Sequence, residues 1–288
     1  RFKEINDSLG QTAGDRILKA VAARLQTTTN PTDTVSRLGG DEFTVVVEDI
    51  VSEEEAFEVA RKILLAFAQP LLVDERSEIS ITPSIGISVY PAHGLAPTDL
   101  LKHADTAMYQ AKSIGRNTYL AYTEAMETQT RQRANITAAL RRALDRNEFQ
   151  LLYQPRLSLA RGRITGVEAL LRWHSEEIGE MMPSDFIPIA EETGMILRIG
   201  DWVLREACRT LAQWQRSGLA DVAIAVNVSV LQLLRGNLPE LIGAVLAETG
   251  APAARLELEV TETMVMENAA ETRNILNQLR ALGLSLAI

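Results

Sequence analysis

Hydrophobic and polar positions in the first 120 residues follow two different periods. Between helical stretches, two β-rich runs at 34–38 and 43–47 flank a Gly-Gly pair, which predicts a hairpin, and residues 79–89 predict another strand. The order of these segments predicts an α+β layer. Apolar residues recur at helical spacing in three segments, residues 11–29, 52–68 and 97–113.

The pattern changes after residue 122. Residues 123–147 are polar, carry Arg and Glu and contain no Pro or Gly, which predicts a stiff connecting helix. Beyond it, β-rich and helical segments alternate, which predicts a parallel sheet or a (β/α) barrel over residues 148–288. The predicted strands are 149–153, 164–172, 222–229, 256–261 and 284–288, and the predicted helices are 184–197, 201–217, 238–248 and 269–281.

Length and composition fit two folded domains, 1–122 and 148–288, joined by that helix. The chain has 288 residues, of which 46% are hydrophobic and 23% charged, the balance of a globular protein. The net charge of −9 argues against a broad basic face for duplex DNA, so we expect no DNA partner.

Other features of the sequence bear on the cellular compartment. The single cysteine, Cys208, has no partner for an internal disulfide or a multi-cysteine metal site, so we expect a reducing cytoplasm. No apolar run is long enough to span a membrane. The chain starts without Met or a signal peptide, so we expect a piece of a longer protein whose sensor, membrane-bound or not, lies outside this window.

The hairpin at Gly39-Gly40-Asp41-Glu42 is the first candidate site. Two glycines let a ligand lie against the backbone, and adjacent carboxylates are suited to hold Mg²⁺ next to phosphate. The same four residues also make an ordinary turn without chemistry.

Flanking residues favour the chemical interpretation. The first 120 residues closely resemble the GGDEF family of diguanylate cyclases. The matching residues, in order, are Phe2-Lys3-Glu4-Ile5-Asn6-Asp7, Gly10, Gly14-Asp15, Arg37-Leu38-Gly39-Gly40-Asp41-Glu42-Phe43, Ala111-Lys112 and Gly115-Arg116-Asn117.

The resemblance implies a palm-like, nucleotidyl-cyclase-like α+β domain, two copies of which join two GTP molecules into cyclic di-GMP. In that reading Asp41 holds Mg²⁺ and helps to deprotonate the attacking hydroxyl, with Glu42 beside it. The family's first metal-binding Asp lies before Phe2, and Asn30 replaces the Arg of the product-inhibition site. The implied nucleotide-binding residues are Lys3, Lys112 and Arg116 for the triphosphate, Asn6 and Asp15 for guanine, and Gly39 and Gly40 at the hairpin. The alternative for Lys112 and Arg116 is a cation that complements a helix C-terminus.

In the second half, polar side chains recur at predicted strand ends. Glu168, Asn227 and Glu259 each follow or interrupt an apolar strand, and the ends of barrel strands form the active face. Three oxygen ligands on successive strands favour a metal site. Each residue also has a structural alternative: Glu259 paired with an Arg, or Asn227 holding a turn.

From about residue 135 the chain looks like the EAL family of cyclic-di-GMP phosphodiesterases, which are modified TIM barrels. The matching segments are Tyr153-Gln154-Pro155, Gly166-x-Glu168-Ala169-Leu170-x-Arg172-Trp173, Pro183-x-x-Phe186-Ile187-Pro188-x-Ala190-Glu191, Gly194, Gly200-x-Trp202-Val203-Leu204, Asn227-x-Ser229 and Glu259-x-Thr261-Glu262.

This second resemblance implies that Glu168, Asn227 and Glu259 bind Mg²⁺ or Mn²⁺, which activates a water that opens cyclic di-GMP to linear pGpG. Gln154 and Arg172 then touch the dinucleotide, and Glu262 steadies an active-site loop. The family's Asp-Asp pair and catalytic Lys are absent from this chain, so we expect the chain alone to be inactive and the complete barrel to be active. The alternative function is a non-catalytic receptor that binds GTP or cyclic di-GMP.

Overall fold

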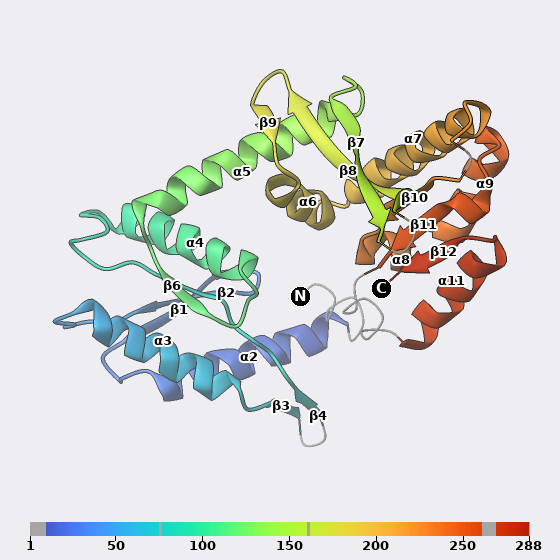
Figure 1. Ribbon diagram of the computed structural model, residues 1–288. Coiled ribbons are helices and arrows are strands. Elements are labelled where there is room, and N and C mark those ends of the chain that lie inside the picture. Colours follow the sequence, from blue (N-terminus) through green and yellow to red (C-terminus); the bar gives the residue numbers. More distant parts are fainter. Residues whose placement is uncertain (1–9, 75–76, 160–161, 220, 261–268, 288) are drawn as a thin grey trace. The chain divides into compact units, whose positions relative to one another are not determined.

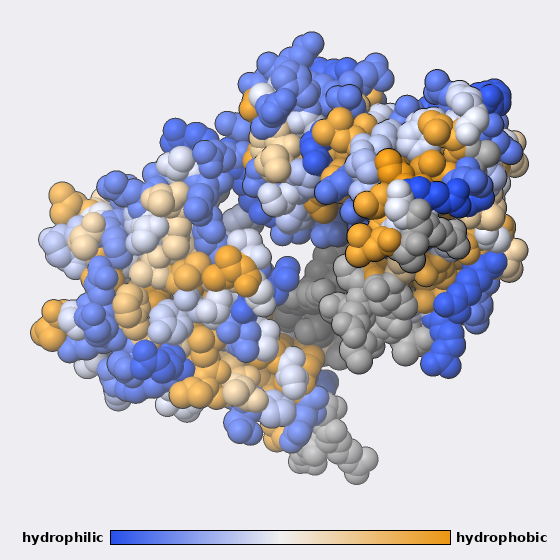
Figure 2. Space-filling model, viewed as in Figure 1, coloured by the Kyte–Doolittle hydropathy of each residue, from blue (hydrophilic) through white to orange (hydrophobic). Residues whose placement is uncertain are grey.

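The computed structural model describes residues 10–74, 77–159, 162–219, 221–260 and 269–287. The chain divides into two compact units, residues 1–131 and 132–288, and each is described by itself (Figure 1). Hydrophilic and hydrophobic areas alternate on the visible face of each unit (Figure 2). Within the described ranges, no helix combines the length and the apolar character needed to cross a bilayer.

The first unit packs helices against three short pairs of strands. β1 pairs with β2 and β3 with β4 as antiparallel hairpins, whereas β5 and β6 are parallel. The strands are β1 (Thr34–Gly39), β2 (Glu42–Val46), β3 (Leu71–Asp74), β4 (Ser77–Ile79), β5 (Ile85–Ile87) and β6 (Tyr119–Ala121), and the helices are α2 (Gln11–Thr28), α3 (Glu53–Phe67) and α4 (Pro97–Ser113).

Gly86 determines how closely α4 approaches the sheet. A Cβ atom at this position of β5 would lie 1.9 Å from the carbonyl oxygen of Ala104 and 2.2 Å from the amide nitrogen of Met108, both in α4. Only glycine permits such contact, because backbone atoms of a helix do not move aside as a side chain does. The contact fixes α4, whose last turn contains Lys112.

The strand predicted over 79–89 is wrong as one element. The chain forms β4 and β5 with an irregular segment between them. Pro83 lies in this segment and has no N–H to donate to a neighbouring strand, which explains the interruption.

The connecting helix is shorter than its predicted range of 123–147. α5 runs over Glu124–Ala143, and Asn147, with a φ of 55°, adopts the left-handed conformation that often follows a helix. Arg142 and Arg146 near its C-terminal end both pair with Glu177, which fixes this end within the second unit.

The second unit is built on one six-stranded sheet in the order β12-β11-β10-β8-β7, with β9 paired to β8. β8, β10, β11 and β12 are parallel, as predicted, whereas β7 and β9 are antiparallel to β8. The strands are β7 (Phe149–Ser158), β8 (Arg163–Ser175), β9 (Gly179–Met181), β10 (Ala223–Asn227), β11 (Leu256–Glu259) and β12 (Ser285–Ala287).

Helices cover one face of this sheet (Figure 1). Trp173, Ile224 and Leu256 point to that side and are almost fully buried in the core. Because side chains alternate along a strand, Glu168, Asn227 and Glu259 lie on the opposite face. The helices are α6 (Pro183–Glu192), α7 (Ile196–Arg216), α8 (Val230–Arg235), α9 (Leu238–Thr249), the 3₁₀ turn η1 (Ala253–Arg255) and α11 (Ala269–Ala281).

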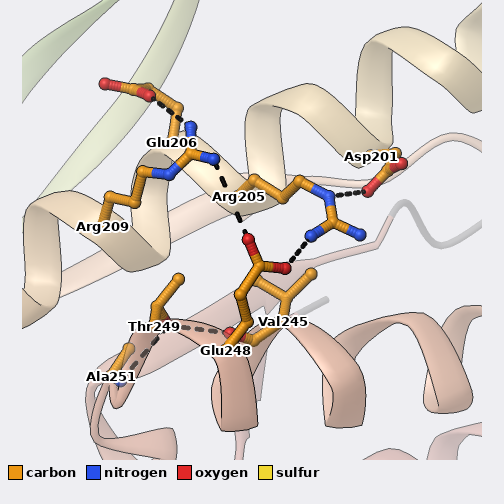
Figure 3. Close-up of polar contacts among 8 residues, drawn as sticks. All are labelled: Asp201, Arg205, Glu206, Arg209, Val245, Glu248, Thr249 and Ala251. Atoms are coloured by element: carbon orange, nitrogen blue, oxygen red, sulfur yellow. Dashed lines mark hydrogen bonds and ion pairs between the residues drawn. The ribbon is translucent and has the colours of Figure 1, made fainter.

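An ion-pair network joins α7 to α9 (Figure 3). Arg205 of α7 donates to Asp201 in its own helix at 2.8 Å and also pairs with Glu248 of α9. Arg209, one turn further along α7, lies 3.9 Å from Glu248. The network fixes two covering helices whose apolar sides pack against the sheet.

Several predictions in this unit differ from the structure: β7 extends five residues beyond the predicted 149–153, and α7 begins at Ile196 and not at residue 201. The helix predicted over 184–197 ends at Glu192, because Gly194 has a φ of 75° and breaks the helical path before α7. α8 was not predicted from periodicity, although Ser229 and Gln232 form the capping box that starts it.

Candidate functional site: two polar sites, one in each unit

The polar face of the second unit gathers the predicted oxygen ligands at one edge of three strands. In the strand register, Glu168 of β8 lies opposite Ala225 of β10, and Asn227 lies opposite Glu259 of β11. Asn227 and Glu259 are the last residues of β10 and β11, whereas Glu168 lies inside β8, one residue before the last position of β8 that pairs with β10. The three side chains therefore lie side by side where β10 and β11 end. We call this group the oxygen site.

Two members of the oxygen site are in direct contact. The amide Nδ2 of Asn227 donates to Oε1 of Glu168 at 2.8 Å. Burial raises the pKa of Glu259, the negative charge of Glu168 raises it further, and Arg156 opposes both effects. A carboxyl whose charge is destabilised by a neighbouring carboxylate is stabilised by a divalent cation placed between them.

The donor chemistry fits Mg²⁺ or Mn²⁺. Both ions prefer oxygen ligands, and the site offers two carboxylates and one amide oxygen, once the Asn227 amide turns over. Among the described residues, no three His, Cys, Asp or Glu side chains form a group that could hold a metal ion, and the third donor of the oxygen site is an asparagine.

The structure places both predicted dinucleotide contacts on the same face. Gln154 of β7 is exposed and lies opposite Glu168 in the antiparallel register. Arg172 lies four residues after Glu168 on β8, and its Nη1 donates to the carbonyl of Leu171 at 2.8 Å. Glu262, the predicted loop residue, lies outside the described residues.

Arg156 was missed by the sequence reasoning. Its Nη1 lies 2.7 Å from Oε1 of Glu257 and 3.0 Å from Oε1 of Glu259. The proposed structural alternative for Glu259, an ion pair with an arginine, is therefore realised in the structure. The sequence did show a cation directly after Tyr153-Gln154-Pro155. Its carboxylate partners, however, are about 100 residues away in sequence.

The second polar site is the hairpin of the first unit. Gly39 lies opposite Glu42, so Gly40 and Asp41 form a two-residue turn in which Gly40 has a φ of 54°. The carboxylates of Asp41 and Glu42 are on exposed residues at its tip. This predicted hairpin is confirmed, with bounds within one residue of the expected runs.

Arg37 is a second residue that sequence reasoning did not assign a role. Its Nε and Nη2 both donate to the carbonyl oxygen of Gly40, at 3.0 and 2.7 Å, and so form a pair of hydrogen bonds across the turn. Two bonds from a planar guanidinium fix the orientation of that peptide. Arg37 thereby shapes the turn that presents Asp41.

The other predicted nucleotide contacts of this unit lie on α2, in the last turn of α4 and directly after α4. Asp15 is exposed on α2, and Lys112 is exposed in the last turn of α4. Arg116 has a φ of 61°, and its backbone N–H donates to the carbonyl of Ala111 at 3.1 Å. A non-glycine residue held in the left-handed region often marks a functional loop. Lys3 and Asn6 lie outside the described residues.

The family assignment follows from comparison with known proteins. Residues 137–288, more than half of the chain, match the family model described as "EAL domain". This chain belongs to the EAL domain family. Residues 1–118 match the model described as "Diguanylate cyclase, GGDEF domain". Both resemblances drawn from the sequence are confirmed, and with them a palm-like GGDEF domain followed by a TIM-barrel-like EAL domain. Enzymes of both families generally depend on divalent metal ions.

Several relatives match this chain along nearly its whole length. The "Bifunctional diguanylate cyclase/cyclic di-GMP phosphodiesterase MucR" of Pseudomonas aeruginosa is 39% identical over 287 residues, which are 100% of this chain and 42% of that protein. "Cyclic di-GMP phosphodiesterase NbdA" of the same organism is 38% identical, covering 100% of this chain and 36% of that protein. "Cyclic di-GMP phosphodiesterase PdeR" of Escherichia coli is 33% identical, covering 98% and 42%. The chain spans less than half the length of these relatives.

A solved structure supports the fold of the EAL domain. The structure described as "PaMucR Phosphodiesterase, c-di-GMP complex" is 42% identical with a TM-score of 0.52, and the match covers 54% of this chain and 62% of that one. A second, "Structure of EAL Enzyme Bd1971 - cGMP bound form", is 27% identical with a TM-score of 0.51, covering 66% and 50%.

Proposed function

We propose that the protein turns over cyclic di-GMP, and that its EAL domain hydrolyses the cyclic dinucleotide to pGpG. The observation that carries this proposal is the oxygen site: Glu168 and Asn227 in contact, with Glu259 on the adjacent strand. The two relatives named as cyclic di-GMP phosphodiesterases and the solved complex of PaMucR with c-di-GMP support the choice of substrate.

Each residue of the EAL face has a role in this proposal. Glu168, Asn227 and Glu259 hold Mg²⁺ or Mn²⁺. The positive charge of this ion lowers the pKa of the attacking water and offsets the negative charge of the phosphodiester. Gln154 and Arg172 orient the dinucleotide along the same face. Attack by water breaks one of its two phosphodiester bonds, and the sugar oxygen leaves with a proton. Glu262 keeps its sequence-based role of steadying the neighbouring loop.

The GGDEF domain supplies the opposite reaction in the proposal. Asp41 and Glu42 at the hairpin tip hold the divalent ion, and Gly39 and Gly40 let the triphosphate approach the backbone. Phosphoryl transfer depends mainly on positioning and charge. Two copies of the domain are needed to join two GTP molecules, so we also propose a homodimer. The remaining contacts are Lys3, Lys112 and Arg116 for phosphate and Asn6 and Asp15 for guanine.

Product identification tests both activities. The full-length protein is incubated with cyclic di-GMP, and separately with GTP, in Mg²⁺ or Mn²⁺, and the products are separated by chromatography. We expect pGpG from the first incubation and cyclic di-GMP from the second. Tight binding of both nucleotides with neither product formed would establish the receptor function instead. Omitting the metal is the matched control, and we expect it to abolish both products.

A further inference from the structure

The side chain of Arg156 crosses the polar face of the EAL sheet. Arg156 is on β7 and reaches β11, three strands away. Three strand spacings amount to about 14 Å on a flat sheet, near the combined reach of an arginine and a glutamate. The strands beneath its path carry small residues in register, Gly166 on β8 and Ala223 on β10. The small residues leave room for this crossing.

The ion pair is shared between two carboxylates with different surroundings. Glu259 lies opposite Asn227 in the oxygen site, whereas Glu257 lies opposite Ala225, two residues before the strand end. Both glutamates are about three-quarters buried, with side-chain exposures of 24% and 25%. Together with Glu168 they place three carboxylates on one face, and the guanidinium between them reduces their mutual repulsion.

We propose that Arg156 is a positioning residue of the oxygen site: it holds Glu259 before the metal ion binds, and it stays on Glu257 once Glu259 coordinates the ion. This inference rests on the proposed function, because it assumes that the oxygen site binds a divalent ion. Glu257 then serves as the second ion-pair partner of Arg156. Before the ion binds, Arg156 competes with it for Glu259.

The competition predicts the direction in which removal of Arg156 changes the metal affinity. A unit positive charge about 6 Å from a divalent ion in a partly solvated site weakens ion binding by about tenfold. Removing that charge therefore tightens metal binding, whereas simple damage to the site loosens it. Removing Glu257 has the opposite effect, because Arg156 then pairs with Glu259 alone.

Titration with Mn²⁺ alone, followed by isothermal calorimetry on the full-length protein, tests the proposal without any turnover. We expect Arg156→Gln to bind Mn²⁺ at the EAL domain about tenfold more tightly than the wild type. We expect Arg156→Lys, which keeps the charge, to stay close to wild type. Asp41→Asn is included in every protein compared, also in the one that is otherwise wild type, so that the GGDEF hairpin contributes no metal binding. Arg163→Gln, which removes an arginine five positions before Glu168 on β8, is the matched control, and we expect it to leave the affinity unchanged.

The double variant shows whether Glu257 acts through Arg156. We expect Glu257→Gln to weaken Mn²⁺ binding at least threefold more in the wild-type background than in Arg156→Gln. Equal effects in the two backgrounds, or unchanged or weaker binding in Arg156→Gln, overturn the positioning role. If the wild-type EAL domain binds no Mn²⁺ at all, the metal site of the proposed function fails, and the inference falls with it.

Discussion

We expect Glu168→Gln to lower the rate of pGpG formation by about a thousandfold, because a divalent ion typically supplies several kcal/mol of transition-state stabilisation. Glutamine keeps the shape of the side chain and an oxygen that can still accept from Asn227 Nδ2, a bond of 2.8 Å in the wild type. The substitution therefore removes the negative charge that holds the ion and preserves the local packing. The measurement is the steady-state rate with saturating Mn²⁺, together with the thermal unfolding temperature of the variant.

Glu180→Gln is the matched control for this variant. Glu180 lies on β9 of the same sheet with a side chain that is 90% exposed, and we expect no change in rate. Unchanged turnover in Glu168→Gln, with the wild-type unfolding temperature, would remove the oxygen site from the mechanism.

The second large effect is expected at Gly86. Alanine there places its methyl carbon 1.9 Å from the Ala104 carbonyl oxygen, so α4 must move away from β5. Overpacking against backbone costs about 3 kcal/mol, which lowers the unfolding temperature of a domain of this size by about 10 °C or more. Movement of α4 also displaces Lys112, so we expect cyclic di-GMP synthesis from GTP to fall. Thermal unfolding and the cyclase assay measure the two effects.

The control glycine is Gly243 in α9. Its added methyl group would meet nothing nearer than Leu282 Cδ2 at 3.9 Å, and alanine is the better helix former by about 1 kcal/mol. We expect Gly243→Ala to be neutral or slightly stabilising. If Gly86→Ala unfolds at the wild-type temperature, close packing of α4 on β5 does not stabilise the GGDEF domain.

Local patterns were enough to predict most elements of both domains. The hairpin follows from two β-rich runs around Gly39-Gly40, and the parallel strands of the EAL domain follow from the alternation of β-rich and helical segments. Glu168, Asn227 and Glu259 were predictable as a group, since each follows or interrupts an apolar run and parallel strands bring such positions together, although Glu168 lies inside β8 and not at its end.

Features that depend on strand register were not predictable. Arg156 meets Glu257 and Glu259 only because the register of the strands β7, β8, β10 and β11 brings these residues together. No local pattern of residues encodes that register. The closeness of Gly86 to α4 likewise depends on how a helix packs on a strand. The break at Pro83 was visible in the sequence, but the apolar run around it masked the signal.

Hydrolysis of cyclic di-GMP in H₂¹⁸O with Mn²⁺ tests the central claim most directly. The full-length protein is used in excess over the cyclic dinucleotide, and the product is examined by mass spectrometry. Because water is the attacking group, we expect linear pGpG with one ¹⁸O atom on its terminal phosphate, and none from Glu168→Gln over the same time. Cyclic di-GMP that is bound by the wild-type protein but recovered intact and unlabelled would contradict the account.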